Sequence, residues 1–499
     1  MAVWLALILL LPFIGALVFL IGALLFVSDV PSWFREKRAG YLATFWVVAA
    51  LIAALVVITE SLGKPPALFL FGQMPWIQVE TKLFGVLLDP LSLLMLAVTV
   101  VIGLLVVIFS IDYLSSKNHE HPVTSGWMRY YLWLLFFIFS MVGLALSPNL
   151  LQFLIFWELT TICSAALISF YDDEKSYQAG FKALLMTHAP GLFFVVGLAL
   201  VFVYTGTFDF ASIGKLPSTI KASVIILLLL AGWAKSAQGP FYTWIPEAMV
   251  APTPVSAYLH AAAMVKAGAF LIARIFCSGF EVSTGIGILT AIVAILTMYG
   301  GLVFYFRQDD LKKLLAYSTI TNVGYIFLGL GIGVMGPVVG LRGGLLHLIC
   351  HAFSKTILFL SVGVISYSTG TRLMSRLSGL ARRSPFLAFA FIVGVLSVTG
   401  IPPFSCFWSK FYIIVGAFEL NSALGTVLGL LILGESVGAF ICFILVTQRV
   451  FFGKGAEGDT PLVFPGLFKV ILGVLIVLAL LSPLFGIPLL EGVKSTAVG

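Results

Sequence analysis

Apolar runs long enough to cross a lipid bilayer recur from one end of this sequence to the other. The first, Val3 to Val27, begins almost at the N-terminus, and others of about 20 residues follow at short intervals. Of the 499 residues, 61% are hydrophobic and only 10% are charged, against about 25% charged in soluble domains. The chain is therefore expected to be an integral membrane protein whose fold is organised by the bilayer.

Runs of this length predict helices, so the expected fold class is all-α. The polar residues and helix breakers between the runs divide the chain into about fourteen membrane-spanning helices. They are expected to begin near residues 3, 40, 84, 130, 149, 177, 220, 254, 284, 312, 337, 385, 427 and 469. The longest links between them are about 15 to 20 residues, so no soluble domain is expected.

Several features exclude other classes of protein. The first run has no basic segment before it and no small-residue cleavage site, which indicates a retained helix and not a signal peptide. The cysteines lie singly in apolar runs, so neither a disulfide framework nor a metal cluster is indicated. No nucleophile has a base at useful spacing, and no glycine loop is placed to hold phosphate. We expect no cofactor, no bound metal and no catalytic residue.

The net charge of +7 carries information about topology. Most Lys and Arg residues fall on the membrane side that holds Arg35, Lys37 and Arg38. By the positive-inside rule this side is cytoplasmic, and both termini of a multi-pass cell-membrane protein would then lie outside. Because the charges are spread over short loops without interleaved aromatic residues, they do not predict a nucleic-acid surface.

Ionisable side chains inside the spans are the strongest functional signal. Each is expected to cost about 2.5 to 3.5 kcal/mol at the bilayer centre, so a purely structural bundle has little reason to keep several. They are Lys182, Lys235, Lys266, Lys355, Lys410, Glu158 and Glu435. The roles of Lys182 and Glu435 stay open, as does that of Glu247, which is expected near the cytoplasmic mouth.

Two spans are interrupted by helix breakers close to a lysine. The first, "AGWAKSAQGPFYTWIPEAMVAPTP", contains Gly239 and Pro240, and the second, "SVTGIPPFSCFWSKFYIIVGAF", contains Pro402 and Pro403. Backbone groups freed by a break must be buried in protein or face a wet cavity, so water is expected to reach mid-membrane. A packing kink at each proline is the alternative.

Lys235, Lys266 and Lys410 are candidate proton carriers. Taking an ammonium out of water favours its neutral form, which lets the group load and unload a proton. Snorkelling or structural pairing is the alternative, although all three are placed near the middle of their spans. Glu158 is the expected counter-charge of Lys235, unless its carboxyl is protonated and hydrogen-bonded locally.

His347, His351 and Lys355 fall at i, i+4 and i+8 in "HLICHAFSK" and share one helical face. A proton relay is preferred here over a metal site, because a metal needs a third ligand and the next group on this face is a lysine. Buried histidines that are satisfied by local hydrogen bonds remain the alternative.

The other histidines are less informative. His260 lies six positions before Lys266, so any link between them needs water. His188, close to a proline, is a weaker candidate, whereas His119 and His121 sit in a loop and are expected to be solvated.

A faint internal repeat runs through the chain. "AGFKALLMTHAPGLFFVVG" around Lys182 resembles "HAFSKTILFLSVGVI" around Lys355, and each is followed one span later by a broken helix that carries a lysine. Transporter folds are often built from two such halves. We expect three N-terminal helices in residues 1–129, five-helix repeats in 130–277 and 284–452, and a last helix in 453–499.

Four stretches resemble one known family. They are "FWELTTICSAALI", "AKSAQGPFYTWIPEAMVAPTPVSAYLHAAAMVKAGAFLIAR", "DDLKKLLAYSTITNVGYI" and "GIPPFSCFWSKF". Over about residues 85 to 455 the chain is similar to the antiporter-like subunits shared by respiratory complex I, Mrp-type sodium/proton antiporters, and membrane-bound hydrogenase and sulfur-reductase complexes. The resemblance implies fourteen helices, inverted five-helix repeats, and broken seventh and twelfth helices.

The resemblance also implies roles for the candidate residues. Glu158 and Lys235 would form a charge pair. Lys266 would bridge, with His260 nearby, and Lys410 would be the outlet group. A central hydrophilic axis would continue between them through His347 and His351.

The motifs "FWELTTICSAALI" and "MVKAG" resemble those of the Mrp, hydrogenase and sulfur-reductase subunits more than those of complex I. The long lateral helix of the largest family members is lacking after the fourteenth helix, which favours a shorter subunit. The expected partners are related antiporter-like chains, other membrane subunits and a peripheral redox module.

We therefore expect a subunit that translocates protons, with possible exchange for Na⁺. A partner is expected to drive it, because the balance between two states of the subunit shifts only when a partner stabilises one state more than the other. Three alternatives stay open. They are a self-sufficient secondary cation/proton antiporter, a proton-pumping subunit of complex I, and a structural spacer or quinone-site subunit.

Overall fold

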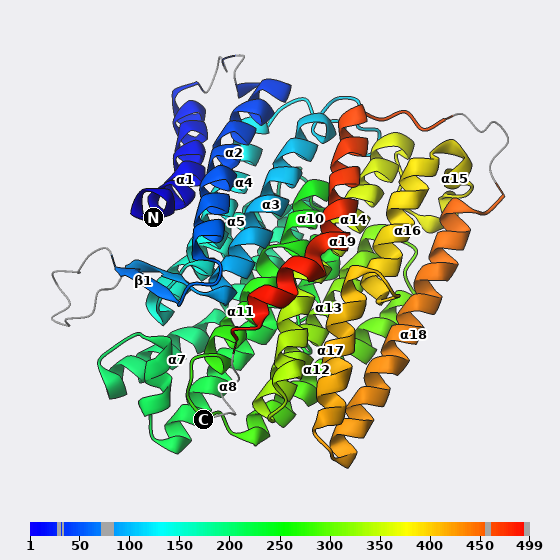
Figure 1. The fold of residues 1–499 in the computed structure, drawn as a ribbon. Coiled ribbons are helices and arrows are strands. Elements are labelled where there is room, and N and C mark those ends of the chain that lie inside the picture. The colour runs from blue at the N-terminus through cyan, green and yellow to red at the C-terminus, as the bar shows by residue number, and fades with distance from the viewer. Residues whose placement is uncertain (27–30, 32–33, 71–83, 455–460, 494–499) are drawn as a thin grey trace.

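The computed structural model describes residues 1–26, 31, 34–70, 84–454 and 461–493. Within these residues, long helices make up nearly all of the regular structure, so the expected all-α membrane fold is confirmed. The helices run roughly alongside one another, with α1 (Ala2–Leu25) at one end of the bundle and α18 (Ala423–Phe451) at the other (Figure 1).

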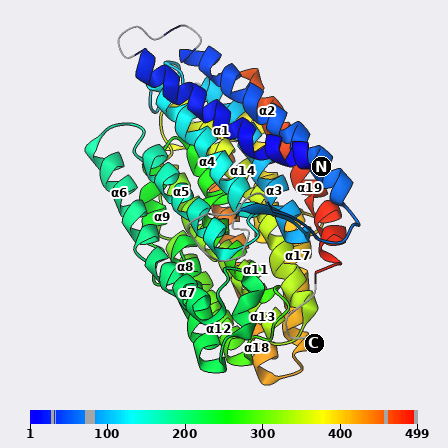
Figure 2. The same ribbon diagram turned by 90° about the vertical axis from the view of Figure 1, so that its left-hand side faces the viewer.

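The first half of the chain contributes helices up to α11. In chain order after α1 they are α2 (Glu36–Ser61), α3 (Pro90–Tyr113), α4 (Trp127–Ala145), α5 (Leu150–Ile168), α6 (Glu174–His188), α7 (Gly191–Thr205), α8 (Ser218–Lys235), α9 (Trp244–Glu247), α10 (Thr253–Ala261) and α11 (Met264–Phe276). Short 3-10 helices, η2 (Phe210–Lys215) and η3 (Ala248–Val250), lie in the connections. Of these helices, α6 to α9 gather on the side away from α1 and α2 (Figure 2).

The second half begins after Phe276. Its helices are α12 (Thr284–Tyr305), α13 (Leu311–Val334), α14 (Val338–Thr369), α15 (Leu380–Arg383), α16 (Pro385–Thr399), α17 (Ser405–Glu419), α18 and α19 (Gly466–Leu490), with the 3-10 helix η4 (Met374–Arg376) after α14. Thirteen segments of the described chain are long and apolar enough to cross a membrane. Helix α16, the first part of the broken pair α16 and α17, is apolar but shorter, and it begins at the position expected for a further span.

One helix start was expected too early. The third span was placed near residue 84, but Gly85–Leu88 is a strand, β2, which pairs antiparallel with β1 (Ala67–Leu70). Helix α3 starts later because Asp89 caps it, accepting a hydrogen bond from the Ser92 N–H at 2.8 Å, and Pro90 occupies its first turn. A short apolar run is compatible with either a strand or a helix, so the sequence alone did not predict the antiparallel pair of β1 and β2.

Two further helices are interrupted without having been predicted so. Helix α6 ends at His188 and α7 begins at Gly191, with Pro190 at the junction. Helix α10 ends at Ala261 and α11 begins at Met264, and Ala263 has the non-helical dihedrals φ −113° and ψ −105°. Alanine is the best helix former, so local sequence gives no sign of this second interruption.

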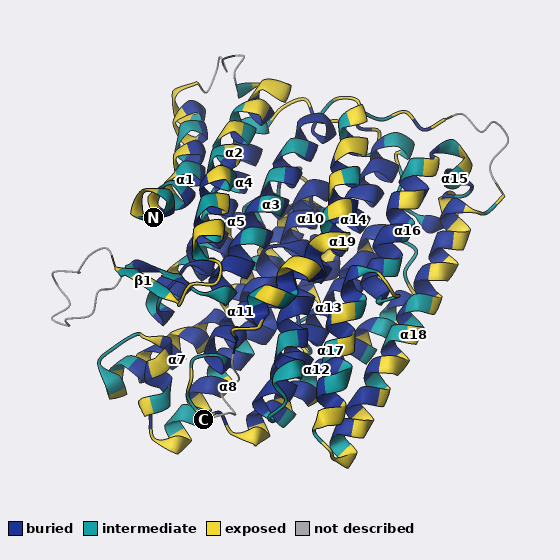
Figure 3. Ribbon diagram, in the orientation of Figure 1, coloured by how far each residue is buried: buried dark blue, intermediate teal, exposed yellow. Residues whose placement is uncertain are grey.

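The most deeply buried helices lie in the middle of the bundle (Figure 3). The most apolar stretches of α14 and of the α10–α11 segment are entirely buried, and the most apolar stretch of α13 is 94% buried. Helix α19 packs across α14 and α3 and covers them on one side (Figure 1). The candidate groups Lys266, His347, His351 and Lys355 on these central helices are therefore enclosed by protein.

Candidate functional site: buried lysines and histidines along the bundle

Lys235 is the last residue of α8 and is fully buried. Its ammonium donates to the carbonyl oxygen of Trp157 at 2.7 Å and to the Thr161 hydroxyl oxygen at 2.5 Å. It also lies 4.7 Å from the centre of the Trp157 ring, within cation–π range. Both described hydrogen-bond acceptors of the Lys235 ammonium thus come from a single turn of α5.

Glu158, the expected counter-charge, belongs to that same turn but points to another partner. Its carboxylate lies 2.7 Å from Nδ1 of His188, and the two side chains are 28% and 56% exposed. Lys235 bonds instead to the carbonyl of the preceding residue, Trp157. The turn of α5 that carries Glu158 therefore also binds Lys235, but Glu158 has its direct contact with His188, the weaker candidate, and none is described with Lys235.

Lys266 lies in the first turn of α11, just after the interruption of the α10–α11 span. Its ammonium donates to the carbonyl oxygen of Leu348 in α14 at 2.6 Å. His260 lies on the other side of the interruption, stacked on Phe359 with 5.4 Å between ring centres. Among the described residues neither ring nitrogen of His260 has a hydrogen-bond partner.

The three groups predicted on one face of α14 are all buried. His347 shares hydrogen bonds with the Ser409 hydroxyl at 2.8 Å and with Oδ1 of Asn322 at 3.2 Å. His351 stacks on His347 with 5.7 Å between ring centres, and both of its nitrogens lack a partner within the described chain. Lys355 donates to the carbonyl oxygen of Leu315 in α13 at 2.9 Å.

Lys410, in α17, has a richer set of partners. Its ammonium donates to the carbonyl oxygen of Thr399 at 3.2 Å and to the Ser436 hydroxyl at 3.3 Å, and it lies 4.0 Å from the Glu435 carboxylate. It also lies 4.3 Å from the centre of the Tyr325 ring, whose hydroxyl donates to Glu435. The sequence singled out Glu435 as a buried acid but did not identify this pairing.

Lys182 and Glu247, both without an assigned role from the sequence, form an ion pair at 2.5 Å between α6 and α9. The pair is half-exposed on the side of the bundle formed by α6 to α9 (Figure 2).

No three His, Cys, Asp or Glu side chains of the described ranges gather as ligands of a metal ion would.

The first predicted break, at Gly239 and Pro240, lies where α8 ends and the chain turns toward α9. The freed Gly239 N–H donates to the Thr297 hydroxyl at 3.0 Å. The Gln238 side chain donates to the carbonyl oxygen of Ile320 at 3.3 Å and to that of Ser236 at 3.0 Å. Side chains and main chain of neighbouring segments therefore satisfy groups that the break releases.

The second predicted break joins α16 to α17 and contains Pro402 and Pro403. Gly400 ends α16 with φ +84°, a left-handed conformation that favours glycine. A Cβ atom there would lie 2.8 Å from Cδ of Lys410. The turn thus needs glycine both for its backbone and to let the Lys410 side chain pass. The Gly239–Pro240 and Pro402–Pro403 peptide bonds are both cis.

Lys235, Lys266, Lys355 and Lys410 therefore share one arrangement. Each ammonium donates to a main-chain carbonyl of a different span or of the other half of a broken one. A carbonyl oxygen accepts a hydrogen bond from an ammonium and from a neutral amine alike. Among their described partners, only Lys410 has a carboxylate within 4.0 Å.

Comparison with known proteins gives matches over most of the chain. The family model described as "NADH:quinone oxidoreductase/Mrp antiporter, TM" matches residues 147–434. The model for the N-terminus of chain 5 of NADH-ubiquinone oxidoreductase (complex I) matches residues 76–122. The first match alone covers more than half of the chain and includes the candidate lysines and Glu158, and it ends one residue before Glu435.

Two curated relatives belong to different kinds of complex. A chloroplastic NAD(P)H-quinone oxidoreductase subunit 5 from Chara vulgaris is 36% identical over 441 residues, which is 84% of this chain and 64% of the relative. An Na(+)/H(+) antiporter subunit from Alkalihalophilus pseudofirmus is 36% identical over 411 residues, which is 76% of this chain and 49% of the relative. The chain thus spans about half to two thirds of the length of these relatives.

Two solved structures share the fold. A chain of the Mrp complex from a Dietzia species superposes with a TM-score of 0.82 at 30% identity, over 97% of this chain and 50% of that one. A chain of the membrane-bound sulfane sulfur reductase, an archaeal respiratory membrane complex, also gives 0.82, at 23% identity over 97% and 96%. This chain belongs to the NADH:quinone oxidoreductase/Mrp antiporter family of membrane subunits.

Proposed function

We propose that the chain translocates protons across the cell membrane as an antiporter-like subunit of a multisubunit complex. The observation that carries the proposal is the set of buried lysines bonded to main-chain carbonyls. A carbonyl oxygen accepts from the amine in either protonation state and, unlike a carboxylate, carries no full negative charge that would keep the amine protonated. A group that can exist in either protonation state is what a proton relay requires.

The proposed route follows the buried groups through the bundle. Protons are taken up from the basic, cytoplasmic side, reach Lys235 through Lys266 and water, and leave through Lys410 on the outer side. His347, His351 and Lys355 on α14, which packs against the second broken helix through α17, continue the relay. Buried polar atoms are normally satisfied by protein or by ordered water, and the unbonded nitrogens of His260 and His351 are suited to hold water on this route.

The energy for transport would come from a partner that displaces Glu158 relative to Lys235. One turn of α5 supplies the carbonyl that holds Lys235 and also carries Glu158. A shift of that turn would change the contacts of both groups together. Because a charge nearby alters how readily an amine binds a proton, such a shift would drive the loading of Lys235.

We further propose the surroundings of the subunit from its charge pattern and its relatives. The basic side faces the cytoplasm and both termini lie outside. Residues 130–277 and 284–452 act as two inverted repeats, each with one lysine at a helix break. Related antiporter-like chains and a peripheral redox module, of hydrogenase or sulfur-reductase type, are the proposed partners, and an Mrp-type assembly would add Na⁺ as the exchanged ion.

The proposal is tested by Lys235→Ala in the assembled complex. Proton movement is followed with a pH-sensitive dye in sealed vesicles, and assembly is checked by size-exclusion chromatography. The matched control is Lys469→Ala, which removes an exposed lysine of α19. An assembled Lys235→Ala complex is expected to have lost translocation, and one that pumps at the wild-type rate would overturn the proposal. Ion exchange by the purified chain alone would instead indicate a self-sufficient antiporter.

A further inference from the structure

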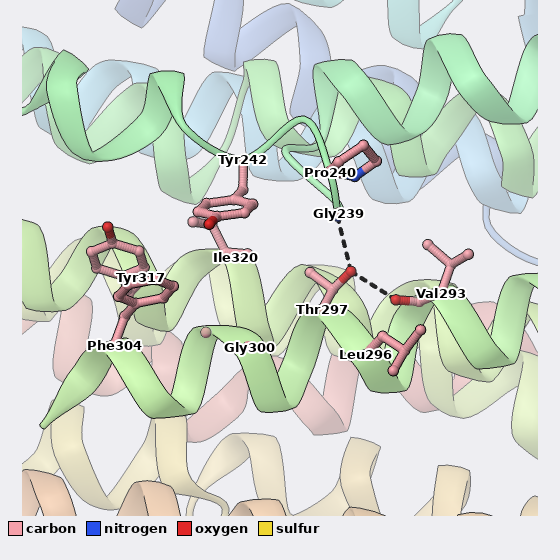
Figure 4. Close-up of a pocket in the computed structure, with 11 residues that line it drawn as sticks. Gly239, Pro240, Tyr242, Val293, Leu296, Thr297, Gly300, Phe304, Tyr317 and Ile320 are labelled. Carbon is pink, nitrogen blue, oxygen red and sulfur yellow. Dashed lines mark hydrogen bonds between the residues drawn. The ribbon is translucent and has the colours of Figure 1, made fainter.

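An apolar groove lies on the exposed side of the first helix break. Its volume is about 380 Å³, and the residues around it include Gly239, Pro240, Leu296, Gly300 and Phe304. Figure 4 shows the loop with Gly239 and Pro240 on one side and the face of α12 with Gly300 on the other. The groove opens outward where the side chain of Leu296 is 68% exposed.

The groove is lined mainly by apolar atoms and has unoccupied space. A Cβ atom added to Gly300 would meet no atom within 4 Å, so its floor is open. The one polar pair at its inner end is already bonded, since the Gly239 N–H donates to the Thr297 hydroxyl and that hydroxyl donates to the carbonyl oxygen of Val293 (Figure 4). Such a surface is suited to hydrocarbon and not to water.

A second cavity of about 270 Å³ lies nearer the basic side, and it is charged. The residues around it include Lys175, Lys313, Arg372 and Glu247. Glu247 is paired with Lys182, and Arg372 is paired with Asp310. Throughout the described ranges neither Lys175 nor Lys313 has a carboxylate within ion-pair distance, so the cavity presents two unneutralised ammonium groups.

Aromatic side chains connect the groove to this basic cavity. Tyr317 lines the groove one helical turn beyond Lys313 on α13, and Tyr242 lines it one turn before Pro246, which borders the basic cavity. The Phe304 ring stacks on Tyr317 with 4.9 Å between centres and lies 6.0 Å from Tyr242. Tyrosine side chains that join an apolar to a charged region are typical of sites at the level of lipid headgroups.

We propose that the groove and the basic cavity together bind one anionic phospholipid. An acyl chain fills the groove against Pro240 and Gly300, and the phosphate lies between Lys175 and Lys313. A zwitterionic lipid would bring its own ammonium into a cavity that already carries unneutralised cations, so it binds more weakly. The acyl chain then packs against the outer side of the break that follows Lys235.

The site can be mapped by photocrosslinking, independently of transport. The intact complex is placed in phosphatidylcholine vesicles with a trace of phosphatidylglycerol that carries a diazirine in its acyl chain, and labelled peptides are identified by mass spectrometry. Label is expected on residues 293–304 and 239–242. Unlabelled phosphatidylglycerol should compete at this position, whereas unlabelled phosphatidylcholine should not.

Variants separate the two parts of the proposed site. Gly300→Leu fills the groove and should abolish labelling there, whereas Gly473→Leu, at an equally open glycine on α19, should not. Lys175→Gln with Lys313→Gln should weaken phosphatidylglycerol competition by roughly tenfold to thirtyfold. Equal competition by both lipids, wild-type labelling in Gly300→Leu, or no label on residues 293–304 and 239–242 in the wild-type complex would overturn the proposal.

Discussion

Lys410 and Glu435 face each other inside the second half of the bundle, with 4.0 Å between Nζ and Oε2. They come from neighbouring helices, α17 and α18, and both are buried. The Tyr325 hydroxyl donates to Glu435 and its ring faces the ammonium, so one tyrosine touches both partners. Within the part of the chain that the structure describes, Lys410 is therefore the buried lysine of the site with a carboxylate close enough to stabilise its charged form directly.

Glu435→Gln should impair the outlet of the relay. Glutamine keeps the shape and still accepts from Tyr325, but it no longer favours the ammonium form of Lys410, so translocation is expected to fall by roughly tenfold or more. Dye-monitored proton movement in vesicles is the measurement. Ser436→Ala, which removes a neutral contact of Lys410, is the control with a smaller expected loss. Wild-type transport by Glu435→Gln would show that the pair is structural.

Thr161→Val tests the hydrogen bond between Lys235 and the Thr161 hydroxyl. It removes the hydroxyl that accepts from the ammonium and leaves the Trp157 carbonyl in place. The bond from Lys235 is lost together with the 3.2 Å bond that the Thr161 hydroxyl donates to the Trp157 carbonyl, so translocation is expected to change by roughly twofold to tenfold. The matched control is Thr187→Val, because the buried Thr187 hydroxyl donates only to carbonyls of its own helix, α6, among the described contacts. Equal effects from the two variants would contradict a specific role for Thr161.

His188 and Glu158 are expected to act as one unit. Their side chains meet at 2.7 Å, so removing either one should disturb the same step, and Glu158→Gln with His188→Ala should transport no more slowly than the worse single variant. Translocation rates of the two single variants and the double variant are compared. His119→Ala, in a loop, is the control. Losses that simply multiply in the double variant would mean that the two residues act separately.

Gly400→Ala should destabilise the second break. Its φ of +84° disfavours any residue with a Cβ, and the new atom would lie 2.8 Å from Cδ of Lys410. The expected loss of stability is about 1 to 3 kcal/mol, seen as a lower apparent unfolding temperature of the detergent-solubilised protein. Gly300→Ala, on α12 with open space around it, should leave that temperature nearly unchanged. Equal shifts in the two variants would show that Gly400 is not strained.

Much of the fold followed from the sequence because lipid imposes a simple rule. Apolar runs of about 20 residues must be helical, and the observed starts of most spans lie close to those expected. The hairpin before Pro90 and the interruption at Ala262 and Ala263 were missed. In the first case a short apolar run is ambiguous, and in the second the packing of the bundle overrides a strong local preference for helix.

The candidate site was predictable residue by residue but not contact by contact. Lys235, Lys266 and Lys410 stand out because a charge inside an apolar span is costly. Their partners do not stand out, since a carbonyl of Trp157 or Leu348 has no sequence signature. His188 was ranked low because its neighbouring proline says nothing about Glu158, which comes from another helix.

The sequence by itself determined that this chain is a membrane bundle, which spans carry ionisable groups, and where proline and glycine break two of them. These are local properties, set by the transfer of each segment from water to lipid. The tertiary structure alone decided what each buried group touches. Lys266 meets Leu348 across 82 positions of the chain, because hydrogen bonds in a helical bundle are chosen by which helices pack together and at what height.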